Sequence, residues 1–181
     1  MGEDQDYEEW ARHAPSEITT DTIWRTPAYR LSLFAVSCAQ TDLHWLVRHR
    51  ATRPHIDQLL RAVGGISASL DEGYSRSSGR ERAHFYEYAL GSAREARGWY
   101  FKCRCGAPAV AAVRIALLTR IIRILTAVIP RERESSSMKP KGRQPHNETP
   151  APDHPAAALS RCSREPVPAN SNQRWSVVGS W

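Results

Sequence analysis

Residues 57–99, with the sequence DQLLRAVGGISASLDEGYSRSSGRERAHFYEYALGSAREARGW, predict two amphipathic helices joined by a short polar turn. A largely apolar stripe recurs at helical spacing through the first helix: Ile56, Leu59, Leu60, Val63, Ile66, Ser67 and Leu70. Gly73 is expected to end this helix in the left-handed conformation that glycine favours. Ser78 and Glu81 have the S-x-x-E spacing of a capping box, which opens the second helix. We expect the rest of the chain to pack on this hairpin or to extend from it as tails.

The second helix of the hairpin carries a stripe with heptad spacing: Phe85, Ala89, Ser92, Ala96, Trp99 and Cys103. Its many small residues would allow another helix to come close. Gly64 and Gly65 lie inside the first helix, where each glycine costs roughly 1 kcal/mol relative to alanine. That cost predicts close approach of a neighbouring backbone at these two positions.

Two further helices flank the hairpin. The first begins at Thr26, its expected N-cap, and has the stripe Ala28, Leu31, Ala35, Cys38, Asp42 and Trp45. The last runs from Pro108 to Pro130, and its apolar arc of roughly 200° is wider than the stripe that a surface helix needs. The excess predicts a second buried surface, most simply a subunit interface. Together the four helices predict an all-α fold, an antiparallel up-down four-helix bundle.

Composition divides the chain into three parts. We expect residues 1–23 to form an acidic mobile arm with at most a short helix, residues 24–131 the bundle, and residues 132–181 a disordered tail rich in proline and serine. Residues 25–134 hold 18 basic and nine acidic residues, a net charge of +9. Nearly all the basic residues are arginine, which suits bidentate contact with phosphate, although a GC-rich genome would produce the same excess.

The sequence predicts a soluble protein of the reducing cytoplasm. Residues 1–24 lack the apolar core of a signal peptide, and three arginines interrupt the most apolar run, residues 107–129, which disfavours a membrane span. Cys103 and Cys105 lack the spacing and the partners of a zinc site. No metal or other cofactor is therefore expected.

Parts of the hairpin resemble the four helix bundle protein family: residues 60–62 (LRA), residues 66–78 (ISASLDEGYSRSS) and residues 91–95 (GSARE), with Phe85 and Ala89 between them. This family includes proteins encoded in intervening sequences of bacterial large-subunit ribosomal RNA genes, and the accessory variability determinant of diversity-generating retroelements. The resemblance covers about residues 24–130. It implies a homopentamer and, as in the retroelement member, a reverse transcriptase and its RNA as partners. Ser69 and Asp71 depart from the family pattern, which usually has Asn and Ala there.

Arginines are the candidate functional residues. Six are candidates for nucleic-acid binding: Arg76, Arg80, Arg94, Arg97, Arg120 and Arg123. An ordinary solvated helix face carries the same kinds of residue. A second set is expected to be structural: Glu72, Gly73, Ser78, Glu81, Gly91, Ser92, Glu95 and Arg114. Within it, we expect Glu72 and Glu95 to form ion pairs. Arg114, inside the apolar arc, should pair with Glu95, Glu72 or Asp71, or reach water at the helix end.

The sequence contains no convincing catalytic constellation, so we expect a protein that is not an enzyme. The expected function is that of an oligomeric accessory or scaffold that holds RNA or an RNA-handling enzyme such as a reverse transcriptase. Two alternatives remain open. One is an oligomeric structural protein without affinity for nucleic acid. The other is a ribonuclease that uses Arg50 and His55, whose R-x4-H spacing resembles a four-helix ribonuclease family, although Pro54 interrupts the helix that this arrangement requires.

Overall fold

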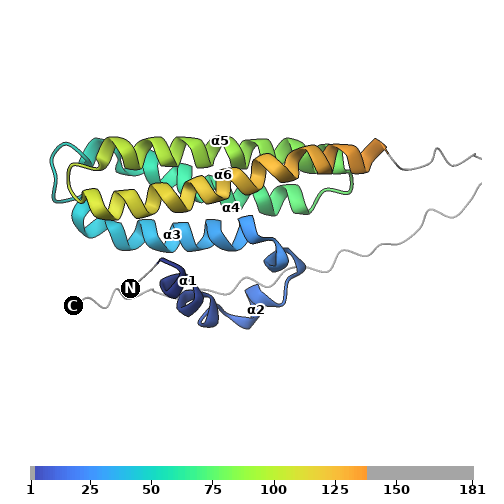
Figure 1. Ribbon diagram of the computed structural model, residues 1–181, viewed down its shortest axis with the longest axis horizontal. Helices are drawn as coiled ribbons and strands as arrows, with labels where there is room; N and C mark the ends of the chain where they lie inside the picture. The colour runs from blue at the N-terminus through green and yellow to red at the C-terminus, as the bar shows by residue number, and fades with distance from the viewer. Residues whose placement is uncertain (1–2, 138–181) are drawn as a thin grey trace, which may run out of the picture. The chain divides into compact units, whose positions relative to one another are not determined.

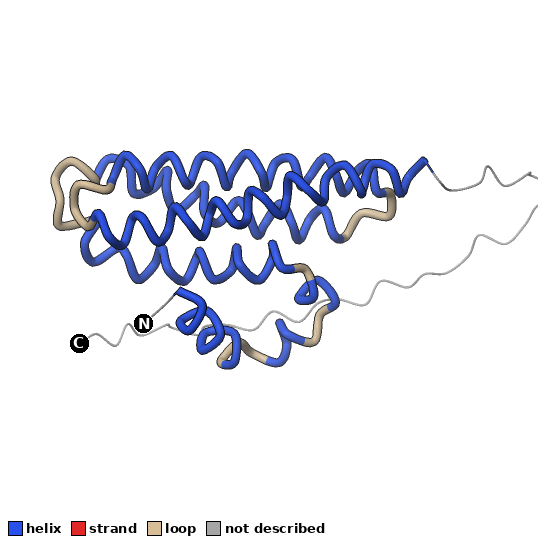
Figure 2. Tube along the Cα trace, in the orientation of Figure 1, coloured by secondary structure: helices blue, strands red, loops and turns tan. Residues whose placement is uncertain are grey.

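The computed structural model describes residues 3–137, and this part of the chain is all-helical, as the sequence predicts. The helices follow one another along the chain (Figures 1 and 2): α1 (Glu3–Arg12), α2 (Ser16–Thr19), η1 (Thr22–Arg25), α3 (Pro27–Leu46), η2 (Arg53–His55), α4 (Ile56–Tyr74), α5 (Gly79–Cys103) and α6 (Pro108–Ser137). Most of the predicted tail, from residue 138 to Trp181, lies outside the described residues.

The four long helices, α3 to α6, lie side by side and share one hydrophobic core (Figure 1). α5 packs against α4 and α6, and α3 contacts the same two helices. The stripe predicted for α3 is buried at every position, from Ala28 to Trp45. The predicted N-cap differs, because the side chain of Thr26 makes no capping hydrogen bond.

The buried face of α5 is rotated from the predicted one. Its buried side chains are Ala83, Tyr86, Ala89, Ala93, Ala96, Tyr100 and Cys103. Phe85, Ser92 and Trp99, which the heptad placed in the core, are only half-buried. The cause is the run of alanines, which have no measurable exposure and allow α5 to approach its neighbours closely through its middle. The two tyrosines fill the wider spaces toward its ends.

The N-terminal segment packs on α3, which differs from the mobile arm that its acidic composition predicts. The ring centroids of Tyr7 and Trp10 lie 5.5 and 5.4 Å from that of Phe34. Trp10 also stacks on Trp24 at 6.0 Å. These aromatic side chains bury enough surface to offset the entropy lost when the segment is ordered.

α6 continues through Pro130 to Ser137, whereas the sequence predicts that it stops at the proline. Proline lacks the N–H that would bond four residues back, and it normally interrupts a helix. Here the last turns of α6 are held from outside, because Glu132 pairs with Arg82 at 2.9 Å and Arg133 pairs with Glu87. The end of the helical part therefore lies beyond the predicted boundary at residue 131.

Most of the wide apolar arc of α6 is covered within the chain itself. Its core residues are Leu117, Leu118, Ile121, Ile122, Leu125 and Ile129. Val113 remains exposed, at 38%. The surface left for a subunit interface on this helix is thus smaller than the sequence indicates. None of the helices among residues 3–137 has the length and the apolar character needed to cross a membrane.

Gly73 serves close packing and not a left-handed turn, which corrects the prediction. α4 extends one residue beyond it, and a Cβ at Gly73 would lie 2.9 Å from the Cβ of Phe85. A neighbour does come close at Gly65, but it is a side chain and not the predicted backbone, since a Cβ there would lie 3.0 Å from Ser92 Oγ. The prediction of close approach is wrong at Gly64, since nothing lies within 4 Å of a Cβ there.

Candidate nucleic-acid interface on helix α5

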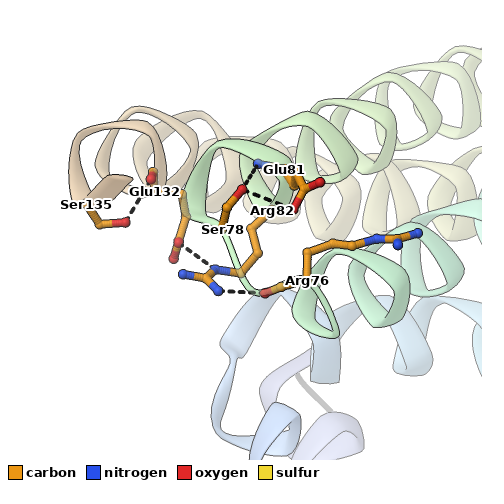
Figure 3. Close-up of polar contacts among 6 residues, drawn as sticks. All are labelled: Arg76, Ser78, Glu81, Arg82, Glu132 and Ser135. Atoms are coloured by element: carbon orange, nitrogen blue, oxygen red, sulfur yellow. Dashed lines mark hydrogen bonds and ion pairs between the residues drawn. The ribbon is translucent and has the colours of Figure 1, made fainter. Parts of the chain in front are cut away.

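The predicted capping box closes the turn between α4 and α5. Ser78 Oγ accepts the backbone N–H of Glu81 at 3.1 Å and donates to Glu81 Oε2 at 3.1 Å. Arg82 adds a second restraint, since its Nη1 donates to the carbonyl oxygen of Arg76 at 2.8 Å and its Nε to Glu132 at 2.9 Å (Figure 3). The turn is therefore tied both to the start of α5 and to the end of α6.

Gly79 allows α6 to reach this turn. It is buried, and a Cβ in its place would overlap the carbonyl oxygen of Glu132 and the hydroxyl of Ser135. Sequence reasoning placed Gly79 inside the capping motif without giving it a role. The available signal was a glycine in the first turn of a helix, where a better helix former would normally be preferred.

A large cleft lies beside the turn, and we call it the turn cleft. Its volume is about 820 Å³, and it is lined by Arg76, Arg80, Glu81, His84, Phe85, Glu87 and Arg133. Its arginines come from the turn, from α5 and from α6. Carboxylates hold two of them, because Arg76 donates to Glu72 at 2.7 Å and Arg133 pairs with Glu87. The turn cleft is therefore a nearly balanced mixture of charges.

A smaller groove lies farther along α5, and we call it the mid-helix groove. Its volume is about 350 Å³, and it is lined by Arg94, Arg97, Gly98, Phe101, Ile115 and Thr119. Arg97 Nη1 donates to Thr119 Oγ1 at 3.4 Å. Phe101 is 56% exposed, and the Cζ of Arg104 lies 3.9 Å from the centroid of its ring. The residues that line this groove include two guanidiniums and an aromatic ring but no carboxylate.

Four of the six predicted nucleic-acid-binding arginines line one of the two clefts: Arg76, Arg80, Arg94 and Arg97. Arg120 and Arg123 are exposed on α6 and line neither. Sequence reasoning missed Arg133, which lies beyond the proline where α6 was expected to end. It also missed Arg104, although its spacing of three residues from Phe101 places both on one side of the helix end.

Arg114 pairs with Asp42, which corrects the predicted partners Glu95, Glu72 and Asp71. Arg114 Nε donates to Asp42 Oδ2 at 3.0 Å, and its Nη2 donates to Oδ1 at 3.3 Å. The hydroxyl of Tyr100 donates to the same Oδ2 at 2.9 Å. The Asp42 side chain is 2% exposed and that of Arg114 17%. The expectation of a carboxylate partner is confirmed, but the partner comes from α3 and not from the hairpin.

Burial and charge shift the pKa values in this buried triad. Burial raises the pKa of the Tyr100 hydroxyl above its ordinary value, and the negative charge of Asp42 raises it further. Burial by itself would lower the pKa of Arg114, but the hydrogen bond to Asp42 and the negative charges around the guanidinium together outweigh it and raise the pKa above the ordinary value. Both groups therefore keep their protons across the physiological range.

The two candidate carboxylates of the hairpin differ from each other. Glu72 forms the expected ion pair with Arg76 at 2.7 Å. Glu95 accepts a hydrogen bond from the indole Nε1 of Trp99 at 3.2 Å, a contact that the expectation of an ion pair did not include. Gly91, also expected to be structural, has nothing within 4 Å of an added Cβ and is exposed.

The ribonuclease alternative requires Arg50 and His55 to act together from one helix. Arg50 is exposed in the connection after α3, and His55 ends the short helix η2. The ring of His55 stacks on Trp99 with 5.1 Å between centroids, and Lys102 Nζ lies 3.8 Å from the centroid of the Trp99 indole. This arrangement gives His55 a packing role. Among the side chains that the structure describes, residues 7–135, no cluster of three His, Cys, Asp or Glu could hold a metal ion.

The comparison with protein families bears on the hairpin. Residues 48–106 match the model of the 23S rRNA-intervening sequence protein family. The match confirms the predicted resemblance to the intervening-sequence proteins for α4, α5 and the connections beside them. It includes most of the turn cleft and the α5 side of the mid-helix groove. No curated protein and no solved structure matches the chain.

Proposed function

We propose that this protein is a non-enzymatic accessory or scaffold protein of the cytoplasm that binds single-stranded RNA along the mid-helix groove. The observation that carries the proposal is the groove's composition. It combines Arg94 and Arg97 with the exposed ring of Phe101, and no carboxylate lines it.

These residues offer the two interactions that single strands need. Guanidiniums contact successive phosphates, and an exposed aromatic ring provides a surface on which a base stacks, worth about 1–3 kcal/mol per base. Arg104, which already lies over Phe101, adds a third positive charge beside the ring. A duplex would leave Phe101 without a partner, because paired bases are not free to stack on it. The groove therefore favours single strands.

The salt dependence of binding tests the groove directly. We would measure the affinity for a fluorescein-labelled 20-nucleotide single-stranded RNA by anisotropy between 50 and 300 mM NaCl. Replacing Arg94 and Arg97 by alanine together removes two phosphate contacts. The slope of log K against log salt should then fall by about 1.4, because each contact to a single strand contributes about 0.7.

The matched control removes the same charge elsewhere. Arg61→Ala with Arg131→Ala changes two exposed arginines that line neither cleft, and it should leave the slope within about 0.3 of the original. Phe101→Ala should weaken binding without changing the slope, since it removes stacking and not a charge. The proposal would be contradicted if the two double variants changed the slope equally, or if the unaltered protein did not bind the RNA at 50 mM NaCl. The alternative of a structural protein without affinity for nucleic acid would then be favoured.

Assembly is the second part of the proposal. We regard α3 to α6 as an antiparallel up-down bundle that forms a homopentamer, as the resemblance implies. The exposed Val113 on α6 supports a contact between subunits, although most of the apolar arc is already covered. In this role the scaffold would hold RNA and a reverse transcriptase, the partners of the retroelement proteins that the chain resembles.

Sedimentation equilibrium tests the assembly without reference to RNA. A pentamer has five times the 20.4 kDa mass of the chain. Val113→Glu should reduce the mass if α6 carries the contact, because it places a charge in an apolar interface. A stable monomer at micromolar concentration would contradict the assembly and leave the groove intact as a binding site.

A further inference from the structure

The turn cleft has a rigid base and an exposed rim. The base is held by Arg82, whose contacts with the carbonyl oxygen of Arg76 and with Glu132 join the turn to α6 (Figure 3). The two partners of that ion pair are only 27% and 26% exposed. The absence of a side chain at Gly79 lets α6 press against α5 at the same place. These contacts position the cleft whether or not it is occupied.

Two arginines of the rim, Arg76 and Arg133, form exposed ion pairs with carboxylates. In the pair between Arg133 and Glu87 the side chains are 56% and 39% exposed, and in the pair between Arg76 and Glu72 they are 42% and 56% exposed. Such surface pairs contribute about 0–1 kcal/mol each. A more highly charged anion could therefore displace the carboxylates at little cost. Arg80 lines the same cleft from the first turn of α5, where the helix dipole also favours an anion.

We propose that the turn cleft binds a nucleoside 5′-monophosphate, either free or at the 5′ end of an RNA strand, with its phosphate replacing Glu87 on Arg133 and also meeting Arg80. The lining residues carry three arginines and two glutamates, so the site has a net charge of +1 when His84 is neutral. A phosphomonoester carries close to two negative charges at pH 7 and accepts more hydrogen bonds than a carboxylate. Guanidiniums are well matched to it in geometry.

The cleft is built for more than inorganic phosphate. Its volume of about 820 Å³ falls in the range of pockets that enclose organic ligands. The ring of Phe85 lines it, and the Cζ of Arg76 lies 4.7 Å from the centroid of that ring. His84 contributes a second planar ring, whose centroid lies 6.2 Å from the centroid of the Phe85 ring. The two rings stand at 68° to each other, so a nucleobase can lie flat against one of them while the phosphate reaches Arg80 and Arg133. This site is separate from the mid-helix groove.

Calorimetric titration with adenosine 5′-monophosphate tests the proposal in the full chain. Binding should be at least about tenfold weaker for adenosine, and about tenfold weaker in Arg80→Ala and Arg133→Ala, because each loses a hydrogen bond to a charged group. Arg61→Ala, at an exposed arginine that lines neither cleft, is the matched control and should bind the nucleotide unchanged. Equal binding of adenosine and its monophosphate, or no heat at millimolar nucleotide, would overturn the proposal.

Glu87→Gln should strengthen nucleotide binding, whereas the arginine variants should weaken it. It removes the carboxylate that competes for Arg133 but keeps the shape of the side chain, so the nucleotide should bind up to about fivefold more tightly. Merely structural pairing would give no gain in affinity. Circular dichroism confirms that each variant folds, and since this variant gains binding, misfolding cannot imitate the expected result.

RNA probes distinguish the two sources of the phosphate. A 12-nucleotide RNA with a 5′-phosphate should bind more tightly than the same RNA with a 5′-hydroxyl if the cleft takes RNA ends, and Arg80→Ala should remove the difference. If the two RNAs bind equally while the free nucleotide binds, the ligand is the free nucleotide. The nucleotide titration does not depend on RNA binding in the groove, so the failure of one proposal is distinguishable from the failure of the other.

Discussion

The turn cleft and the mid-helix groove lie on the same helix, yet their arginines are in different electrostatic states. In the turn cleft, Arg76 and Arg133 hold carboxylates. In the groove, Arg97 contacts the hydroxyl of Thr119, and no carboxylate is among the lining residues. The comparison shows that the number of arginines on a surface does not predict how it meets an anion. The carboxylates that already face those arginines decide whether binding is direct or needs a displacement.

The two regions also differ in what holds them in place. Near the groove, α3, α5 and α6 are joined by the buried contacts of Asp42 with Tyr100 and Arg114. At the turn cleft, α5 and α6 are joined by partly exposed ion pairs and by the close approach at Gly79. Buried charges are costly to leave unpaired, whereas exposed pairs contribute little. The groove should therefore be the more stable of the two sites.

Asp42→Ala should have the largest effect. It leaves the Arg114 guanidinium without its carboxylate in a site where the side chain is only 17% exposed, and it also removes the hydrogen bond of Tyr100. We expect the free energy of unfolding, measured in urea, to fall by about 3 kcal/mol. Asp42→Leu combined with Arg114→Met should recover most of the loss. A single-variant loss below about 1 kcal/mol would show that Arg114 reaches water and that the groove has no special anchor.

Gly79→Ala should have an intermediate effect, confined to the turn cleft. The added methyl group meets the backbone carbonyl of Glu132, so α6 must shift, at a cost of about 1–3 kcal/mol. Gly91→Ala is the matched control on the same helix. It has open space around the Cβ and should stabilise the protein by about 0.5–1 kcal/mol. The free energy of unfolding of both variants is measured in urea. Equal effects of the two substitutions would show that α6 does not press on the turn.

The helices differ in how accurately the sequence predicts them, and the difference has a physical explanation. The pattern along α3 and α4 is strongly periodic, so their buried faces follow directly from the sequence. The α5 face was predicted less well, because alanine marks a buried face only weakly and Tyr86 and Tyr100 were not counted as core residues. The continuation of α6 past Pro130 depends on contacts with α5 that no local pattern contains.

The sites show the same limit. The capping box is local, and Ser78 caps α5 as predicted. The partner of Arg114 lies 72 residues away on another helix, so local spacing suggested the wrong carboxylates. The arginines of the two clefts could be nominated from the sequence as a group. Whether these arginines face carboxylates, as in the turn cleft, or line a groove without them depends on which side chains the fold brings together. Only the structure shows this.

Alkaline pH should reduce the stability of the fold through its buried tyrosines. Burial raises the pKa of Tyr29 to about 12, and burial also raises the pKa values of Tyr86 and Tyr100 above the ordinary value of 10. Between about pH 10 and 12 the unfolded chain loses these protons while the folded chain keeps them. The unfolded state then binds fewer protons, so the free energy of unfolding falls as pH rises.

The tyrosine nearer each site can be tested separately by urea unfolding between pH 8 and 12. Tyr100→Phe should flatten the alkaline decline, because it removes the tyrosine whose buried hydroxyl bonds to Asp42 beside the groove. It should also lower stability at pH 8 by about 1 kcal/mol through the lost hydrogen bond. Tyr86→Phe, near the turn cleft, should flatten the decline less. A curve unchanged by either substitution would show that Tyr86 and Tyr100 do not cause the decline.

Arg133→Ala should have the smallest effect on stability. It tests whether the ion pair of Arg133 in the turn cleft is weak enough for an anion to displace Glu87. Its ion pair with Glu87 is exposed, so we expect unfolding in urea to change by less than about 1 kcal/mol, and the difference should shrink between 0.1 and 1 M NaCl as the charges are screened. A loss above about 2 kcal/mol at both salt concentrations would mean that the pair holds α6 in place. An anion could not then displace Glu87 cheaply, and the arginines of the turn cleft would be structural, leaving the mid-helix groove as the binding surface on α5.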